Sequence, residues 1–413
     1  MRISYNKFER ELNSFLKAYL EDESFDHLKD RLNLPESEID TTSGKINEFY
    51  RDQLQIDNHQ SKDRIRVDRI ITFSEKRLKP EKFCKFLNEL AHICLSEGKL
   101  DLASEIFRKS KKLTADDQTK AESLLGLADI FSRRAKWNRS IEITKSAKSL
   151  YKLLGDNRGL ARCENILGTI YGELGDIITA KKHFLTSLSL INRDEDLELT
   201  ANLYTNLGIV FNIQGYNSDA INHLSKALSI YSKVGNDKNT SEVNLNIGIV
   251  NLDYGNFPAA LTALDAAIEI AKNSRFLSTL CLSYHVKAQV LIKLNDYYYA
   301  SEFANKALEM SHKLDDRVTV ADIYKVKGII ERNLGNYTAS ETHLLNSLRI
   351  NESVNNELNI AETSYELGLL YEKMNDSSLK NSYLKKSKTY YKNIESLVNV
   401  EKIDSALSFA STI

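Results

Sequence analysis

The histidines are the residues of this 413-residue chain whose type and spacing come closest to a chemical site. His183, His223 and His343 share one register, because the first two lie 40 residues apart and the third lies three such steps further on. A metal site needs ligands that converge on one point within a few ångströms. Histidines that are 40 residues or more apart in one register lie on separate helices of successive structural units instead, so we interpret these histidines as structural.

Sequence patterns for other kinds of chemistry are absent. The chain has no Gly-x-x-x-x-Gly-Lys-Ser/Thr phosphate loop, no Gly-x-Ser-x-Gly turn and no His-Glu-x-x-His. No two of its four cysteines form a Cys-x-x-Cys pair, which favours buried free thiols over a disulfide or a metal site; they are Cys84, Cys94, Cys163 and Cys281. The sequence therefore predicts a protein that is not an enzyme and binds no metal, nucleotide or other cofactor.

Charge and hydropathy argue against two classes of partner. Charged residues make up 27% of the chain and the net charge is −1, which gives no case for nucleic acid. The segment 62–82 is locally basic, with eight Lys/Arg against four acids, and a solvated helix face explains it better than a nucleic-acid patch. We find no signal peptide and no apolar run of 18 residues, so we expect a cytoplasmic protein without membrane insertion.

A recurring small residue organises the chain. After a first step of 37 residues, the spacing is 40 throughout. A fixed period between about 20 and 50 residues is typical of a solenoid of stacked units. The recurring residues are Ala91, Ala128, Gly168, Gly208, Gly248, Ala288, Gly328 and Gly368.

Each period reads as two helices separated by a helix stop. Around Gly208, apolar residues recur at helical spacing, and Ala220, Leu224 and Ala227 mark a second helix. Seven of the eight stops hold Gly or Asn, the residues that adopt left-handed backbone cheaply, and Ala135 is the exception. One such hairpin cannot bury its apolar face alone, so the units must stack.

This recurring pattern of residues resembles the tetratricopeptide repeat. Its pattern of Leu-Gly, an aromatic residue, Gly and Ala is met here by Leu167, Gly168, Tyr171, Gly175 and Ala180. The resemblance covers about 84–393, although the step exceeds the usual repeat of about 34 residues. Units of this length are similar to those of kinesin light chains, spindle-orientation adaptors and Rap-type bacterial peptide receptors. The resemblance implies an all-α, right-handed α-solenoid of about eight hairpins.

The repeat pattern divides the chain into three segments. Residues 1–80 break the repeat and form an N-terminal helical region, with helices expected in 5–32, around 46–54 and over about 61–78; it is either a three-helix bundle or a set of divergent capping helices. The eight units span 84–393, and 394–413 is expected to contain a final capping helix. In the eighth unit Lys380 occupies the small-residue slot of the second helix, so we expect a polar terminal face.

Candidate binding residues lie on one side of the first helices, opposite the packed face. In the family that the chain resembles, this side lines a concave groove. Asn206 and Asn246 can each donate to and accept from an extended peptide, although asparagine also suits a half-exposed helix. Ile209, Ile249 and Ile329 form an apolar strip unless a partner or adjacent second helices cover it. The candidate residues are Asn165, Asn206, Asn246, Ile209, Ile249, His285, Gln289, Lys325, Arg332 and Tyr365.

The sequence favours a non-catalytic adaptor or receptor that binds a peptide or protein segment in its concave groove. One alternative is a receptor similar to the Rap type, in which a signalling peptide bound by the repeats controls N-terminal helices that regulate a partner protein. A second alternative is an assembly scaffold that contacts partners through its convex face. The pattern sets neither the partner nor the oligomeric state.

Overall fold

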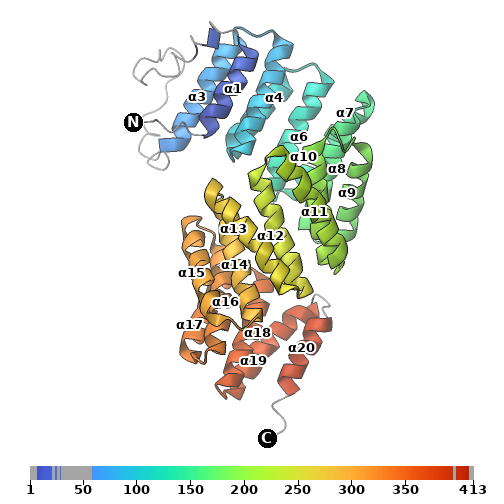
Figure 1. The fold of residues 1–413 in the computed structure, drawn as a ribbon. Helices are drawn as coiled ribbons and strands as arrows, with labels where there is room; N and C mark the ends of the chain where they lie inside the picture. The colour runs from blue at the N-terminus through green and yellow to red at the C-terminus, as the bar shows by residue number, and fades with distance from the viewer. Residues whose placement is uncertain (1–6, 21–23, 26–27, 29–57, 394–396, 409–413) are drawn as a thin grey trace. The chain divides into compact units, whose positions relative to one another are not determined.

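The computed structural model describes residues 7–20, 24–25, 28, 58–393 and 397–408, and every regular element in them is an α-helix (Figure 1). Helices α1 (Lys7–Tyr19) and α3 (Asn58–Glu75), in the described part of the N-terminal region, precede the repeats. The helix expected around 46–54 lies outside the described residues. The chain divides into two compact units, residues 1–196 and 197–413, and each is described by itself.

Eight helical hairpins follow, as the repeat predicts. The first unit contains three of them: α4 (Pro80–Ser96) with α5 (Leu100–Leu113), α6 (Asp117–Arg133) with α7 (Trp137–Leu154), and α8 (Asn157–Glu173) with α9 (Ile177–Leu190). The two units of the repeat that are weakest in sequence, over 84–155, therefore form hairpins as expected.

The second unit contains the other five hairpins and a last helix. They are α10 (Leu197–Ile213) with α11 (Asn217–Val234), α12 (Asp237–Tyr254) with α13 (Phe257–Ser274), α14 (Leu277–Lys293) with α15 (Tyr297–Lys313), α16 (Arg317–Asn333) with α17 (Tyr337–Ser353), α18 (Glu357–Lys373) with α19 (Ser377–Asn393), and finally α20 (Leu397–Ser408).

The recurring small residue sets how closely the two helices of a hairpin approach. A Cβ placed on Gly208 would lie 2.6 Å from Leu224 Cγ on the second helix. The same clash recurs in other hairpins of the second unit, where Gly248 meets Leu264 and a Cβ would lie 2.7 Å from the leucine Cγ. Only glycine allows these leucines to pack directly on the first helix, which explains the 40-residue rhythm.

The helix stops adopt left-handed backbone, as predicted, and Ala135 does so as well. Its φ is 53°, close to the values at the Asn stops, with 60° at Asn295 and 59° at Asn375. The hairpin geometry therefore imposes a left-handed turn even where the residue carries a Cβ that disfavours it.

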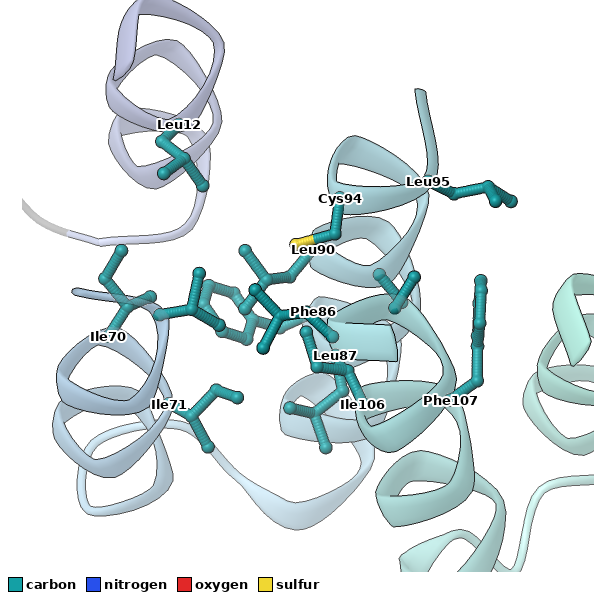
Figure 2. Close-up of a cluster of buried hydrophobic side chains, with 14 of the residues drawn as sticks. Leu12, Ile70, Ile71, Phe86, Leu87, Leu90, Cys94, Leu95, Ile106 and Phe107 are labelled. Carbon is teal, nitrogen blue, oxygen red and sulfur yellow. The ribbon is translucent and has the colours of Figure 1, made fainter. Parts of the chain in front are cut away.

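The N-terminal helices share a core with the first hairpin. Figure 2 shows side chains from several helices gathered in one cluster, with Leu12 of α1 and Ile70 of α3 directed toward Phe86 and Leu87 of α4. Leu12, Ile70, Phe86 and Leu87 are all fully buried. Hydrophobic burial therefore joins α1 and α3 to the repeats.

The basic segment 62–82 packs its charges against α5. Arg64 pairs with Glu105 at 2.5 Å, and Glu75 of the same helix accepts from Lys109 at 3.0 Å. These exposed pairs support the interpretation of a solvated helix face.

The eighth hairpin differs from expectation at one position. Lys380 was expected on a polar terminal face, yet it is only 3% exposed. Its ammonium nitrogen lies 2.5 Å from Glu372 Oε1, on the first helix of the same hairpin. The long side chain is therefore folded back into the hairpin, where the carboxylate stabilises the buried charge.

Candidate functional site

The ten candidate residues all lie on first helices of hairpins. Asn165 is on α8 in the first unit, where it is partly buried. The other nine lie in the second unit, on α10, α12, α14, α16 and α18. These five helices contact one another in succession, α10 with α12, α12 with α14, α14 with α16, and α16 with α18. We call the side of these helices that carries the candidates the first-helix face.

The carboxamides of the first-helix face are half-buried. Asn206 on α10 and Asn246 on α12 occupy the same register in adjacent hairpins. Close by in sequence, Asn212 Nδ2 donates to Asp253 Oδ2 at 2.9 Å, which links α10 to α12. Asn212 Oδ1 is buried and accepts no hydrogen bond from the described residues. The α10–α12 part of the face therefore has two half-buried carboxamides in one register, on helices that Asn212 and Asp253 tie together.

The predicted isoleucine strip is covered unevenly. Ile249 is partly buried and packs against a cluster with residues from its own hairpin and from α14, so neighbouring helices cover it in part. Ile209 is 39% exposed, and Ile213, one turn further along α10, is 60% exposed. Of the three strip isoleucines, only Ile209 on α10 is therefore exposed, whereas Ile249 and Ile329 are half-buried.

His285 lies deeper than the sequence suggests. Only 9% of it is exposed, and Gln289 Nε2 lies 3.2 Å from its Nε2 atom. Because the amide nitrogen donates, His285 Nε2 accepts and the ring proton is assigned to Nδ1, which has no hydrogen-bond partner among the described residues. Burial, reinforced by the charge of Lys325, lowers the pKa of His285 to about 4. The ring is therefore neutral at pH 7.

Lys325 is also buried, and its charge is held by carboxylates. Its ammonium lies 2.5 Å from Glu362 Oε2 and 3.3 Å from Asp322 Oδ1. Burial disfavours the charged form of Lys325, but Glu362 and Asp322 outweigh this effect and raise the pKa of the ammonium. Burial also raises the pKa of Asp322, against the opposing effect of Lys325.

A second, half-buried ion pair joins the same two helices further along. Arg332 Nη1 donates to Glu366 Oε2 at 2.6 Å and to the Glu366 carbonyl oxygen at 3.0 Å. The side chains of Arg332 and Glu366 are 12% and 19% exposed. α16 and α18 are thus joined by two ion pairs, which leaves Lys325 and Arg332 less available to a ligand than the sequence implied.

A pocket of about 200 Å³ opens beside these pairs. We call it the C-terminal pocket, because α20 closes one of its sides. The ammonium of Lys402, from α20, lies 4.4 Å from the centroid of the Tyr365 ring. The lining residues are Lys325, Ile329, Glu362, Tyr365, Glu366, Tyr391, Asn399, Lys402 and Ile403.

Lys325 and Tyr365, which the sequence predicts as groove residues, line this pocket. Its acidic residues and its α20 side were not predicted from the sequence. Glu366 occupies the register of Asn206 and Asn246, and Glu362 lies one turn earlier on the same helix face, so the 40-residue register could have found both. No local signal in the sequence places α20 against α18.

His183, His223 and His343, which share one register, each pack against an aromatic ring. His183 stacks on Tyr171 at 5.3 Å between ring centroids, and its Nδ1 atom lies 2.6 Å from Glu164 Oε2. Burial would raise the pKa of Glu164, but hydrogen bonds from His183 and Lys148 outweigh it and lower the pKa. In the second unit, His223 packs on Phe211 at 4.9 Å. Each imidazole therefore fills a place against an aromatic side chain of its own hairpin.

Other predicted features can be placed within the described part of the chain. All four cysteines are buried and unbridged, as expected. No group of three or more His, Cys, Asp or Glu in the described ranges is arranged to hold a metal ion. None of the described helices combines the length and the apolar composition that crossing a bilayer requires.

Comparisons with known proteins agree with the hairpin architecture. The tetratricopeptide repeat family matches residues 85–117, 159–233 and 199–273. The Tonsoku-like protein of Drosophila melanogaster is 23% identical over 309 residues, which are 64% of this chain and 22% of that protein. This chain therefore spans about a fifth of the length of that relative.

Solved structures resemble the chain over most of its length. The apo form of the quorum sensor NprR from B. thuringiensis is 13% identical with a TM-score of 0.61, over 92% of this chain and 99% of that one. A Rap protein complexed with competence and sporulation factor is 13% identical with a TM-score of 0.59, over 79% and 96%. At these identities the likeness concerns the fold alone. Taken with the repeat matches over 85–117 and 159–273, it shows that the chain contains tetratricopeptide repeats and has the fold of a tetratricopeptide-repeat array, with eight hairpins and a 40-residue step.

Proposed function

We propose that this chain is a non-catalytic receptor or adaptor that binds an extended peptide or protein segment along the first-helix face of its second unit. The observation that carries the proposal is the pair of half-buried carboxamides Asn206 and Asn246 beside the exposed Ile209, on a row of first helices that leads to those lining the C-terminal pocket. Such a face offers hydrogen bonds to a peptide backbone and apolar area to its side chains.

The electrostatics of the face support binding over catalysis. His285 is neutral and buried, while Lys325 and Arg332 are each engaged by a carboxylate of α18. A general base or nucleophile must reach a reacting atom, and these groups are committed to other side chains. The Rap protein of similar fold is complexed with a competence and sporulation factor, which adds support for a ligand-binding role.

The N-terminal helices fit a capping role in this proposal. Their shared core with the first hairpin supports a cap that shields the end of the repeat array from solvent. A Rap-like receptor, in which these helices act on a partner protein, would instead need them to respond to the ligand. Hydrogen exchange of α1 and α3 with and without bound peptide distinguishes the two roles, because a cap keeps its protection unchanged.

The experiment that tests the function removes the two carboxamides. Neighbouring first helices are separated by roughly 10 Å, and an extended peptide repeats every two residues at about 6.6–6.8 Å, so two amides would hold backbone groups about three residues apart. Asn206→Ala and Asn246→Ala should each weaken binding by about 1–3 kcal/mol, or about tenfold or more, with an unchanged melting temperature.

The ligand for this measurement comes from capture by the wild-type chain from its native host, followed by mass spectrometry and titration of the synthetic segment. Asn222→Ala is the matched control, because Asn222 is exposed on the second helix of the same hairpin. If Asn206→Ala lowers stability and leaves binding untouched, the residue is structural and the proposal fails. Binding that survives both first-helix variants but depends on exposed second-helix residues, such as Tyr298, would instead indicate a scaffold that uses its other face.

A further inference from the structure

Charged side chains in the wall of the C-terminal pocket, and directly behind that wall, form one cluster. Lys325, Glu362 and Glu366 line the pocket, whereas Asp322 and Arg332 lie behind it and pair with Lys325 and Glu366. Glu362 uses Oε2 to bind Lys325, and Glu366 uses Oε2 to bind Arg332. The cluster has three carboxyl groups and two cations, so it keeps one negative charge in excess while Asp322 is ionised.

Lys402 of α20 supplies the missing positive charge. Its ammonium lies over the Tyr365 ring at 4.4 Å from the centroid, inside the wall of the same pocket. Among the residues that the structure describes, no carboxylate lies within 4.0 Å of this ammonium. Lys402 is therefore held by an aromatic face and by the field of the cluster, and not by an ion pair of its own.

The attachment of α20 leaves Lys402 easy to displace. Ile403 is 1% exposed and packs against Ala361, Leu384 and Tyr391, which anchors the helix to α18 and α19. Lys402 itself is an exposed residue. Its ammonium can leave the pocket through a change of side-chain rotamer, with Ile403 and the helix still in place.

We propose that the Tyr365 face of the C-terminal pocket is a subsite for a basic side chain, lysine or arginine, of the bound segment, and that the ammonium of Lys402 covers this face in the free protein. The inference rests on the proposed peptide-binding function. A ligand cation would replace Lys402 over Tyr365 and restore the charge balance. A ligand carboxylate would add to the excess negative charge of the cluster, so the geometry favours the cation.

The first experiment tests the pocket without any peptide. Lys402→Ala should bind n-butylammonium, which reproduces the missing side chain, about tenfold more tightly than the wild-type chain does, because Lys402 covers the Tyr365 face in the wild-type pocket. Saturation-transfer NMR and the shift in melting temperature measure this binding. Neutral 1-butanol and anionic butyrate should show no such gain.

Two further variants control the result. Lys388→Ala removes a lysine of α19 that pairs with Asp404 of α20, and it should gain no affinity for butylammonium. Adding Tyr365→Leu to Lys402→Ala should abolish the gain, because the aromatic face is lost. Equal binding of butylammonium and 1-butanol by Lys402→Ala, or tighter binding of butyrate, overturns the subsite.

The second experiment separates this inference from the proposed function. A randomised twelve-residue peptide library displayed on phage is selected against wild type and against Lys402→Met, which keeps the aliphatic stem without its charge. We expect Lys or Arg enrichment at one peptide position, with binding about tenfold tighter to the variant. Selected peptides without this enrichment refute the subsite and leave the groove function standing. A gain for butylammonium with no selected peptide refutes the groove function and leaves a cation pocket.

Discussion

The substitution Gly208→Ala tests whether the recurring small residue is a packing constraint. The new Cβ would lie 2.6 Å from Leu224 Cγ, 2.8 Å from Leu224 Cδ2 and 3.3 Å from the Ala220 carbonyl oxygen. Carbon atoms in favourable contact are about 3.5–4.0 Å apart. Leu224 is fully buried, so it has no open space into which to move.

The size of the effect follows from two opposing terms. Overpacking of a close-packed core costs about 1–3 kcal/mol. Replacing glycine by alanine inside a helix returns about 0.5–1 kcal/mol. We therefore expect Gly208→Ala to lower the free energy of unfolding by about 0.5–2 kcal/mol.

A double-mutant cycle identifies the contact that is responsible. Leu224→Ala alone should cost about 2–5 kcal/mol, because it removes a buried leucine. With that side chain gone, Gly208→Ala should change sign and stabilise the chain by about 0.5–1 kcal/mol. Gly172→Ala on α8 is the matched control, since its Cβ would sit at 3.9 Å from Ala180 Cβ, an ordinary contact, and should stabilise its helix.

Urea unfolding followed by circular dichroism gives the global effect of each variant. Long repeat arrays need not unfold in a single step, so hydrogen exchange of the α10 and α11 amides gives the local opening free energy. If Gly208→Ala is equally unfavourable with and without Leu224, its cost does not arise from this contact and the packing argument is wrong.

Three further predictions follow from individual residues. Burial lowers the pKa of His285 to about 4 from an ordinary value of 6.5, so the unfolded chain takes up the proton first as the pH falls. The free energy of unfolding should therefore drop between pH 6.5 and 4 by on the order of 3 kcal/mol. Denaturant titrations at a series of pH values measure this drop, and His285→Gln should remove it. In the eighth hairpin, Lys380→Met should change the free energy of unfolding in urea by less than about 1 kcal/mol. Glu372→Ala leaves the buried ammonium without its carboxylate and should lower that free energy by about 1–3 kcal/mol. A larger loss for Lys380→Met than for Glu372→Ala would contradict the role given to this pair. Ala135→Gly should raise the melting temperature and the free energy of unfolding, the latter by about 0.5–1 kcal/mol, because φ there is 53° and glycine adopts that backbone without a Cβ penalty. A loss of stability, as glycine causes inside a helix, would refute this.

Much of the fold could be predicted from the sequence because its determinants are local and repeated. Gly208 and its counterparts mark where a first helix must accept a leucine, and the Gly and Asn stops mark where the backbone turns left-handed. A unit that contacts mainly its neighbours shows the same constraints at every step, so the period alone predicts stacked hairpins. Ala135 shows the limit of this logic, because the hairpin imposed the left-handed turn on a residue that disfavours it.

The candidate site was predictable only in part. The register placed Asn206, Asn246 and Tyr365 on one helix face, because helical spacing decides which residues share a side. It did not reveal that Lys325 is engaged by Glu362, since that partner lies on the next first helix and depends on how two hairpins dock.

The C-terminal pocket forms only where helices distant in sequence pack together, so its composition depends on the tertiary structure. Its cation, Lys402, comes from a helix outside the repeat, and no periodic pattern relates Lys402 to Tyr365. Periodicity in a sequence specifies which face each helix buries and where each helix ends. Charge balance between helices depends on distances that arise only when the helices pack, because Coulomb energies and desolvation vary steeply with separation and burial.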